Sequence, residues 1–216
     1  SSAVSLNQFF EEFTLCGIKN HERSCEDIFA LIRPIGIQAE AVMKQATNGV
    51  NTHKGMIFSL GIFCCALGYL YGNDIPYTEA SFRDTCRQMT AKTHGERLYA
   101  RYGITGIRGE AADGYPTVFE TALPVFRQYR NEGLSANDAG VLTLLHIIAG
   151  SVDTNIIARS DYETFRKVQA QIQSMLNSGI DTRDFIAEIR TLDQEFIKMN
   201  ISPGGSADML ALTYIV

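Results

Sequence analysis

The amino-acid sequence predicts an all-α protein, and three observations lead to this fold class. Apolar residues recur at steps of three and four in most segments, as on one face of an α-helix. No segment shows a competing alternation of apolar and polar residues, the pattern of a half-buried strand. No linker or block of charge divides the 216 residues. We therefore expect residues 1–216 to form a single-domain multi-helix bundle with a buried central apolar helix.

The first three helices are expected before residue 73. The first has an apolar face, formed by Leu6, Phe9, Phe10 and Phe13. The second runs from about Ser24 to Ala46 with a break at Pro34, where a new first turn can begin. Residues 55–72 are uncharged and approach the roughly 18–20 residues of a membrane span. We favour a buried central helix because this run holds four glycines and a serine, has no basic residue on its far side and is the only such run.

Helices are also expected through the rest of the chain. Residues 78–89 and 96–102 have helical patterns, whereas residues 103–116 (GITGIRGEAADGYP) carry four glycines and predict an irregular loop. A helix should follow at residues 118–129, and Ser135 with Asp138 resembles a capping box before the next one. The last three helices are expected at residues 162–176, 185–196 and 206–214.

Charge and cysteine content exclude some classes of function. A net charge of −5 argues against a protein that follows nucleic-acid backbones, which normally presents a basic face. The five cysteines include no CxxC pair, and no secretory signal precedes them. We expect reduced thiols, a cytoplasmic location, no nucleic-acid partner and no membrane partner.

Four polar loops carry the residues that could bind a substrate or a metal ion or take part in catalysis. They are residues 48–55 (NGVNTHKG), 108–116 (RGEAADGYP), 151–156 (SVDTNI) and 202–208 (SPGGSAD). Lys54 and Arg108 can bind phosphates, and the glycines before the last helix expose backbone N–H groups where an anion is favoured. The acidic candidates for a divalent metal are Glu110, Asp113, Asp153 and Asp208. Together these loops indicate a site for a nucleoside triphosphate with Mg²⁺.

Each loop also has a purely structural interpretation. SPGGSAD resembles a helix entry with Ser206 as the N-cap, and Asp153 is a plausible cap for the residues after it. His53 taken alone is more typical of a hydrogen-bonded structural histidine, and His146 of a satisfied core residue. Caps alone do not explain why Lys54 and Arg108 lie beside glycines, so we favour the nucleotide site.

Five segments together resemble the triphosphoribosyl-dephospho-CoA synthase family. They are IRPIGIQAE (32–40), NGVNTHKGMIFSLG (48–61), GERLYARYGITGIRGEAADGYPTV (95–118), DTNI (153–156) and ISPGGSADMLALTY (201–214). The resemblance extends from about Ile32 to the C-terminus. It implies a transferase that moves the 5-triphosphoribosyl group of ATP to 3′-dephospho-CoA, releases adenine and makes the prosthetic-group precursor of citrate lyase or malonate decarboxylase.

The resemblance also implies roles for residues of the four loops. Lys54 and Arg108 would bind phosphates, Gly204, Gly205 and Ser206 would form a backbone anion site, and His53 would carry or position a proton. Glu110, Asp153 and Asp208 would act as metal ligands, with Glu110 or Asp208 as base. Asn51, Gly55 and Asn155 complete the expected nucleotide-binding set, with Mg²⁺ accompanying ATP.

Family members carry a further segment upstream of the equivalent of residue 1, with a Pro-Gly-Leu-Val-Asp-Arg run and a later histidine and aspartate. Nothing like it occurs in these 216 residues, so we expect this part of the site to be lacking. Other candidate partners are the transferase that attaches the prosthetic group to the acyl carrier protein and a second copy of the chain. The alternative functions are a Mg²⁺-dependent all-helical nucleotide hydrolase and a non-catalytic helical interaction module.

Overall fold

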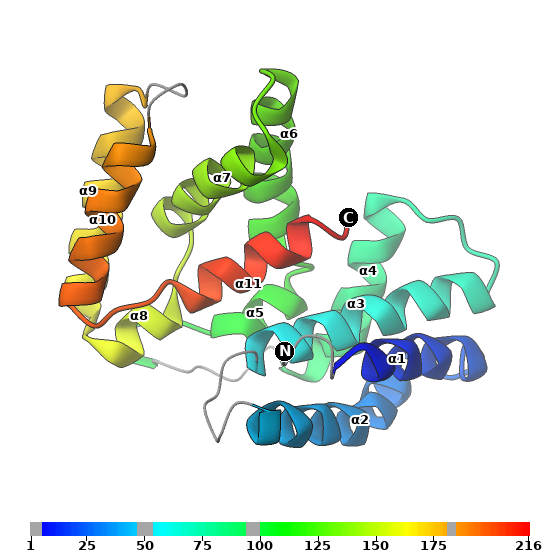
Figure 1. Ribbon diagram of the computed structural model, residues 1–216. Coiled ribbons are helices and arrows are strands. Elements are labelled where there is room, and N and C mark those ends of the chain that lie inside the picture. The colour runs from blue at the N-terminus through cyan, green and yellow to red at the C-terminus, as the bar shows by residue number, and fades with distance from the viewer. Residues whose placement is uncertain (1–5, 47–53, 94–99, 181–184) are drawn as a thin grey trace. The chain divides into compact units, whose positions relative to one another are not determined.

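The computed structural model describes residues 6–46, 54–93, 100–180 and 185–216 (Figure 1). Within these ranges the regular elements are all helical and there is no strand, which confirms the all-α prediction. Two compact units follow each other along the chain, Ser1–Tyr115 and Pro116–Val216. We call them unit 1 and unit 2 and describe each by itself. That they act as a single domain stays a prediction.

Unit 1 is built around one apolar helix. Its elements are α1 (Asn7–Lys19), α2 (Cys25–Ala46), α3 (Lys54–Gly72), α4 (Glu79–Thr90), η2 (Ala91–Thr93), η3 (Ala100–Tyr102) and α5 (Gly106–Ala112). Helix α3 packs against α1, α2, α4 and α5, and most of its apolar side chains are buried. A helix that is apolar on all sides is stable only when its whole circumference is covered. The predicted buried central helix is thus the core of unit 1.

The α1–α3 contact is a close approach of two backbones. A Cβ atom added at Gly17 of α1 would clash with the carbonyl oxygen of Cys65, and one added at Gly68 of α3 would clash with that of Thr14. Glycine is required at both positions because the clashing atoms are backbone atoms that no side-chain rotation can move away.

The burial of helix α3 helps to decide whether residues 55–72 form a membrane span or a buried helix. Among the described residues, residues 55–72 are the one helical stretch long and apolar enough to cross a membrane. More than half of this stretch is buried inside the protein, and its apolar side chains contact three neighbouring long helices. That burial is typical of a core helix of a folded unit.

The predicted break of the second helix at Pro34 is wrong. Helix α2 continues through Pro34, which lies on its exposed face. On the opposite face Ile28 and Ile32 before the proline, and Ala39 and Met43 after it, are all buried. Burial on both sides of Pro34 offsets the roughly 3 kcal/mol that an interior proline costs a helix.

The predicted irregular loop at residues 103–116 is also partly wrong, because it contains α5. Gly109 lies so close to Thr105 that a Cβ atom would clash with the threonine hydroxyl, and Ala111 is fully buried. Tertiary packing thus overrides the low helix propensity of the glycines. The helix ends where the Tyr115 N–H donates to the Glu110 carbonyl at 2.7 Å, with Gly114 at φ +72° and Tyr115 at φ +55°.

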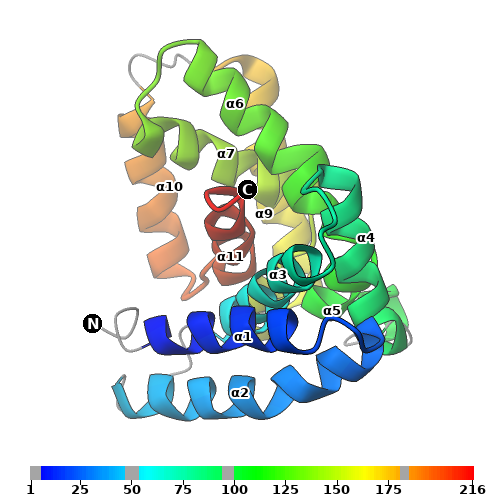
Figure 2. The ribbon, with the colours of Figure 1, turned by 90° about the vertical axis from the view of Figure 1, so that its right-hand side faces the viewer.

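In unit 2, helix α7 packs against four other elements. The elements of unit 2 are η4, a π-helical turn (Thr117–Ala122), α6 (Leu123–Asn131), α7 (Ala136–Gly150), α8 (Thr154–Arg159), α9 (Tyr162–Ser178), α10 (Ile186–Lys198) and α11 (Gly204–Thr213). Helix α7 contacts η4, α6, α9 and α11, and α11 also contacts η4 and α8. Figure 2 labels α6, α7, α9 and α11.

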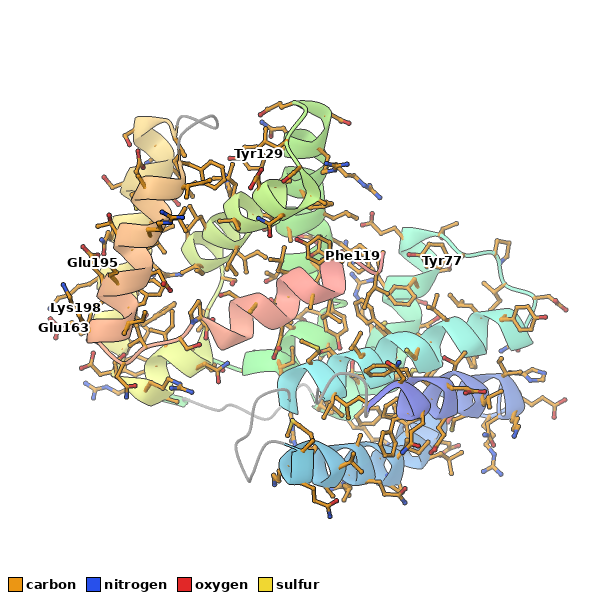
Figure 3. All side chains as sticks on the ribbon, viewed as in Figure 1. Tyr77, Phe119, Tyr129, Glu163, Glu195 and Lys198 are labelled. Atoms are coloured by element: carbon orange, nitrogen blue, oxygen red, sulfur yellow. The ribbon has the colours of Figure 1, made fainter. Side chains whose placement is uncertain are left out.

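Two sequence predictions are confirmed in α7. Ser135 is its N-cap and accepts a hydrogen bond from the Asp138 N–H at 3.0 Å. His146 is a satisfied, half-buried residue, because its Nε2 atom hydrogen-bonds the hydroxyl of Tyr129 at 3.1 Å. Tyr129 is labelled in Figure 3. Burial lowers the pKa of His146 below its ordinary value.

Candidate functional site

The carboxylate of Asp153 links the starts of two helices of unit 2. Its Oδ1 atom accepts hydrogen bonds from the N–H groups of Asn155 at 2.9 Å and Ile156 at 3.2 Å, in the first turn of α8. Its Oδ2 atom accepts from the Ser206 N–H and the Ser206 hydroxyl, both at 2.8 Å, in the first turn of α11. Asp153 is only 1% exposed. The predicted capping role of Asp153 is confirmed, and the same carboxylate also fixes α11.

The two glycines at the start of α11 allow its backbone to approach these side chains. A Cβ atom at Gly204 would lie 3.0 Å from Nδ2 of Asn155, and one at Gly205 would lie 3.2 Å from Oδ1 of Asp153. Both distances are shorter than ordinary van der Waals contacts. The glycines therefore let the first turn of α11 lie directly against the start of α8.

The prediction that Ser206 is the N-cap of the last helix is wrong. Helix α11 begins at Gly204, so Ser206 lies inside its first turn and is 2% exposed. Its hydroxyl donates to Asp153 across a separation of 53 residues instead of capping its own helix. The sequence pattern of a cap could not reveal this partner, since only the fold brings α8 and α11 together.

Asp208 lies in the same helix, two residues after Ser206, and its surroundings differ from those of Asp153. It is half-buried, and no described residue donates a hydrogen bond to its carboxylate. Burial, and secondarily the negative charge of Asp153, raise the pKa of Asp208 from the ordinary 3.8 to about 7. A half-buried carboxylate with a raised pKa favours binding a proton or a cation, and it can exchange protons near neutral pH.

The described residues limit how a magnesium ion would fit. They contain no group of three or more His, Cys, Asp or Glu side chains that could hold a metal. Both oxygens of Asp153 already accept two hydrogen bonds each, so Asp208 is the more available ligand of these two aspartates. Mg²⁺ is often bound by one or two carboxylates together with substrate phosphates. The donor set therefore fits an ion that arrives with a triphosphate.

In unit 1, Arg108 and Glu110 lie on the short helix α5. Arg108 is exposed and Glu110 is half-buried. Two arginines of α4 contact the end of α5, because Nε of Arg83 donates to the Gly114 carbonyl at 2.9 Å and Nε of Arg87 donates to the Asp113 carbonyl at 3.2 Å. Neither arginine stands out in the sequence. Their contacts span 31 and 26 residues and leave no local pattern.

The structure describes some of the other predicted site residues and not others. Asn51 and His53 lie outside the described residues, and Lys54 and Gly55 are the first two residues of α3. The structure brings together one group of six in unit 2, consisting of Asp153, Asn155, Gly204, Gly205, Ser206 and Asp208. A common pocket that also contains Glu110, Lys54 or Arg108 stays a prediction.

Comparison with known proteins shows which family the chain is similar to. The family described as ATP:dephospho-CoA triphosphoribosyl transferase matches residues 1–216. A "2-(5''-triphosphoribosyl)-3'-dephosphocoenzyme-A synthase" of Pectobacterium atrosepticum is 37% identical over 229 residues, which cover 100% of this chain and 75% of that protein. A "Probable 2-(5''-triphosphoribosyl)-3'-dephosphocoenzyme-A synthase" of Photobacterium profundum is 36% identical over 231 residues, covering 100% of this chain and 74% of that protein.

No solved structure matches the chain. The family match covers every residue of both units, and the resemblance found in the sequence segments is confirmed. The chain belongs to the ATP:dephospho-CoA triphosphoribosyl transferase family.

Proposed function

We propose that this protein transfers the 5-triphosphoribosyl group of ATP to the ribose 2′-hydroxyl of 3′-dephospho-CoA and releases adenine. The product is 2′-(5″-triphosphoribosyl)-3′-dephospho-CoA. Membership of the family supports this reaction, as do the descriptions of the relatives. The group of six residues around Asp153 and Asp208 supplies a site suited to part of the chemistry.

The reaction is a displacement at C1′ of the ATP ribose. The bond from C1′ to N9 of adenine breaks, and a bond from C1′ to the 2′-oxygen of dephospho-CoA forms. The hydroxyl proton must go to a base, and the departing adenine must gain a proton. Glycosyl transfers of this kind pass through a transition state with oxocarbenium character, so negative charge near the sugar and well-placed proton carriers accelerate them.

The observation that carries the proposal is the family match over residues 1–216, and the environment of Asp208 suits this residue to part of the chemistry. A carboxylate with a pKa of about 7 can accept a proton from a hydroxyl near neutral pH better than one with an ordinary pKa. The same carboxylate is an available oxygen ligand for an ion that neutralises the triphosphate. We propose that Asp208 performs one of these tasks at the bound ATP, and that Asp153 positions it.

The start of α11 is proposed to receive part of the triphosphate. A helix N-terminus presents unpaired N–H groups and a positive end of the helix dipole. Here Gly204 and Gly205 form the first turn of α11, and both residues are partly exposed. The exposed amide of Asn155 lies beside them and can contribute a further hydrogen bond.

The remaining assignments rest on the resemblance of the sequence segments. Lys54 and Arg108 are proposed to bind phosphates, and Glu110 to act as base or metal ligand. Asn51, His53 and Gly55 are proposed to contact the nucleotide. Mg²⁺ bound with ATP would neutralise phosphate charge. We further propose a cytoplasmic location, with reduced thiols as the sequence suggests.

The test is chromatography of ATP and 3′-dephospho-CoA incubated with the full-length protein and Mg²⁺. We expect free adenine and the triphosphoribosylated product in equal amounts. Asp208→Asn should abolish adenine release while the circular dichroism spectrum stays unchanged. Asp193→Asn is the matched control, since Asp193 is exposed on α10 of the same unit. Normal turnover by Asp208→Asn would remove Asp208 from the reaction.

The same assay separates the alternative functions. Release of phosphate or pyrophosphate without adenine would indicate a nucleotide hydrolase. No change in melting temperature with ATP and dephospho-CoA, together with no product, would indicate an interaction module.

A further inference from the structure

Gln169 is a buried polar residue on the apolar face of α9. Its neighbours on that face are Phe165, Val168 and Ile172, all at most 2% exposed, and Gln169 itself is 8% exposed. An apolar side chain would suit helix packing at this position, and a buried amide costs free energy unless it is hydrogen-bonded. The amide therefore has a task other than packing.

The partners of Gln169 lie at the end of α7. Its Nε2 atom donates to the carbonyl oxygens of Ile148 at 3.1 Å, Ala149 at 3.3 Å and Ser151 at 2.7 Å. Its Oε1 atom accepts from Nη1 of Arg166 at 2.9 Å, which fixes the orientation of the amide. The last carbonyls of a helix have no partners within that helix, so Gln169 supplies a donor where α7 needs one.

Asp153 follows two residues after the last of these carbonyls. Gln169 fixes Ser151 from α9, and Asp153 then begins α8 and reaches the first turn of α11 through Ser206. Two sets of hydrogen bonds, joined by the backbone of residues 151–153, thus connect α9 to the start of α11. All of their members belong to unit 2 and to the described residues.

We propose that Gln169 is a positioning residue for the reaction: by binding the carbonyls at the end of α7 it sets the place of Asp153 and therefore of the first turn of α11. That Gln169 affects catalysis rests on the proposed function. That Gln169 holds Asp153 in position rests on the hydrogen bonds alone.

Two substitutions remove the donor in different ways. Gln169→Met keeps the length of the side chain and its packing but donates nothing. Gln169→Glu keeps the shape but places a carboxylate against three carbonyl oxygens. Gln173→Met and Gln173→Glu are the matched controls, because Gln173 is an exposed residue of the same helix whose amide donates to Asn177 in the next turn.

The first measurement requires no substrate. Amide hydrogen exchange should be followed by NMR at Asn155, Ile156 and Ser206, the three residues whose N–H groups donate to Asp153. In Gln169→Met we expect exchange at these three amides to accelerate at least tenfold more than at the amides of α6. The Gln173 variants should exchange like the wild type. Equal acceleration at all amides of unit 2, or none at these three, would overturn the proposal.

The second measurement is steady-state kinetics of adenine release, corrected for the folded fraction of each variant. Small displacements of a binding group can cost up to about 100-fold in rate. For Gln169→Met we expect kcat to fall by about tenfold or more and KM for ATP to rise several-fold. KM for dephospho-CoA should stay within about twofold, because the affected helix start is assigned to the triphosphate.

The two measurements separate the two hypotheses. If the wild type releases no adenine while the exchange result holds, the proposed function fails and the positioning of Asp153 stands. If adenine is released and Gln169→Met matches the wild type in kcat and KM per folded molecule, Gln169 has only a structural role and the inference is overturned. Equal loss in the Gln173 controls would overturn it as well.

Discussion

Asp153 and Asp208 are the same residue type in two environments only a short distance apart in unit 2. The carboxylate of Asp153 accepts four hydrogen bonds and is buried by the two helix starts that it links. The carboxylate of Asp208 receives none from the described residues, and its pKa is raised to about 7. Proteins commonly assign different tasks to paired carboxylates through such differences in environment. Asp153 is therefore suited to structure and Asp208 to chemistry.

The glycines of α11 allow a test of this division between the two aspartates. Gly205→Ala places a methyl group against the buried Asp153 carboxylate, which cannot move without losing hydrogen bonds. Gly204→Ala places one against the exposed Asn155 amide, which can rotate away. We expect Gly205→Ala to lower adenine release more than about tenfold and to cost about 1 kcal/mol of unfolding free energy, measured in urea.

Gly204→Ala should change the unfolding free energy little, because the better helix propensity of alanine offsets the small shift of Asn155. Gly36→Ala is the control for propensity alone. Gly36 lies within α2 and an added Cβ atom would meet nothing within 4 Å, so this change should stabilise the protein by about 0.5–1 kcal/mol. Equal effects of the two α11 substitutions would contradict a fixed Asp153.

The sequence predicts the roles of individual residues only where the partner is local. The cap formed by Asp153 was predictable because its partners follow two and three residues later. The partner of Ser206 lies 53 residues away, and the raised pKa of Asp208 depends on the burial and on the neighbouring charge that this same contact creates. Gln169 and the arginines of α4 were missed for the same reason.

At the scale of elements, periodic apolar residues predicted most helices correctly. Two exceptions are α5 and the continuation of α2 through Pro34, where local propensity opposes the helix. Of the helix expected at residues 96–102, the first four residues lie outside the described residues and Ala100–Tyr102 form a 3-10 turn, η3. In α5 the glycines serve close packing against Thr105, and in α2 buried residues on both sides of the proline keep the helix intact. Helix propensity is a weak preference that tertiary burial overrides. A single sequence does not show which glycines lie at close contacts between elements.

The crossing of α1 and α3 gives the sharpest prediction at this scale. Gly17→Ala would place a methyl group against the backbone of Cys65 and Tyr69, so the two helices would have to separate. Separation opens gaps between apolar side chains such as Phe13 and those of α3. We expect Gly17→Ala to destabilise the protein by about 2–4 kcal/mol, measured by urea unfolding of the full chain.

Gly36→Ala again serves as the control, since it makes the same chemical change in a neighbouring helix with open space around it. Gly68→Ala should reproduce the loss, because its added methyl group would meet the backbone of Thr14 from the opposite side of the crossing. A Gly17→Ala protein as stable as the wild type would show that α1 and α3 do not approach this closely.

At the scale of the whole molecule, Asp208 makes stability depend on pH. Its pKa in the folded protein is about 7 against an ordinary 3.8, so the folded state binds more protons than the unfolded state between these values. The free energy of unfolding gained from this group is fully present below about pH 4 and is lost as the pH rises to about 7. Above that pH the contribution stays constant.

Another carboxylate, Asp161, acts in the opposite direction at more acidic pH than Asp208. Hydrogen bonds from the N–H of Thr164 lower the pKa of Asp161, which therefore contributes stability that is lost as the pH falls. The measurement must therefore compare wild type with Asp208→Asn at each pH. Subtraction removes the contributions that the two proteins share.

We expect the free energy of unfolding of Asp208→Asn, relative to wild type, to rise between about pH 4 and pH 7 and then to level off. A shift of one pKa unit corresponds to about 1.4 kcal/mol, and partial exposure of Asp208 reduces the total to roughly 1–3 kcal/mol. The Asp193→Asn control should show a difference that does not vary with pH.

If Asp208 contacts the ion that accompanies ATP, saturating Mg²⁺ and ATP should stabilise the wild type most above pH 7, where the carboxylate carries no proton and can bind the cation directly. The same addition should stabilise Asp208→Asn less and equally at every pH. A wild-type response to Mg²⁺ and ATP that is matched by Asp208→Asn would show that the cation binds elsewhere, whatever the pKa of Asp208.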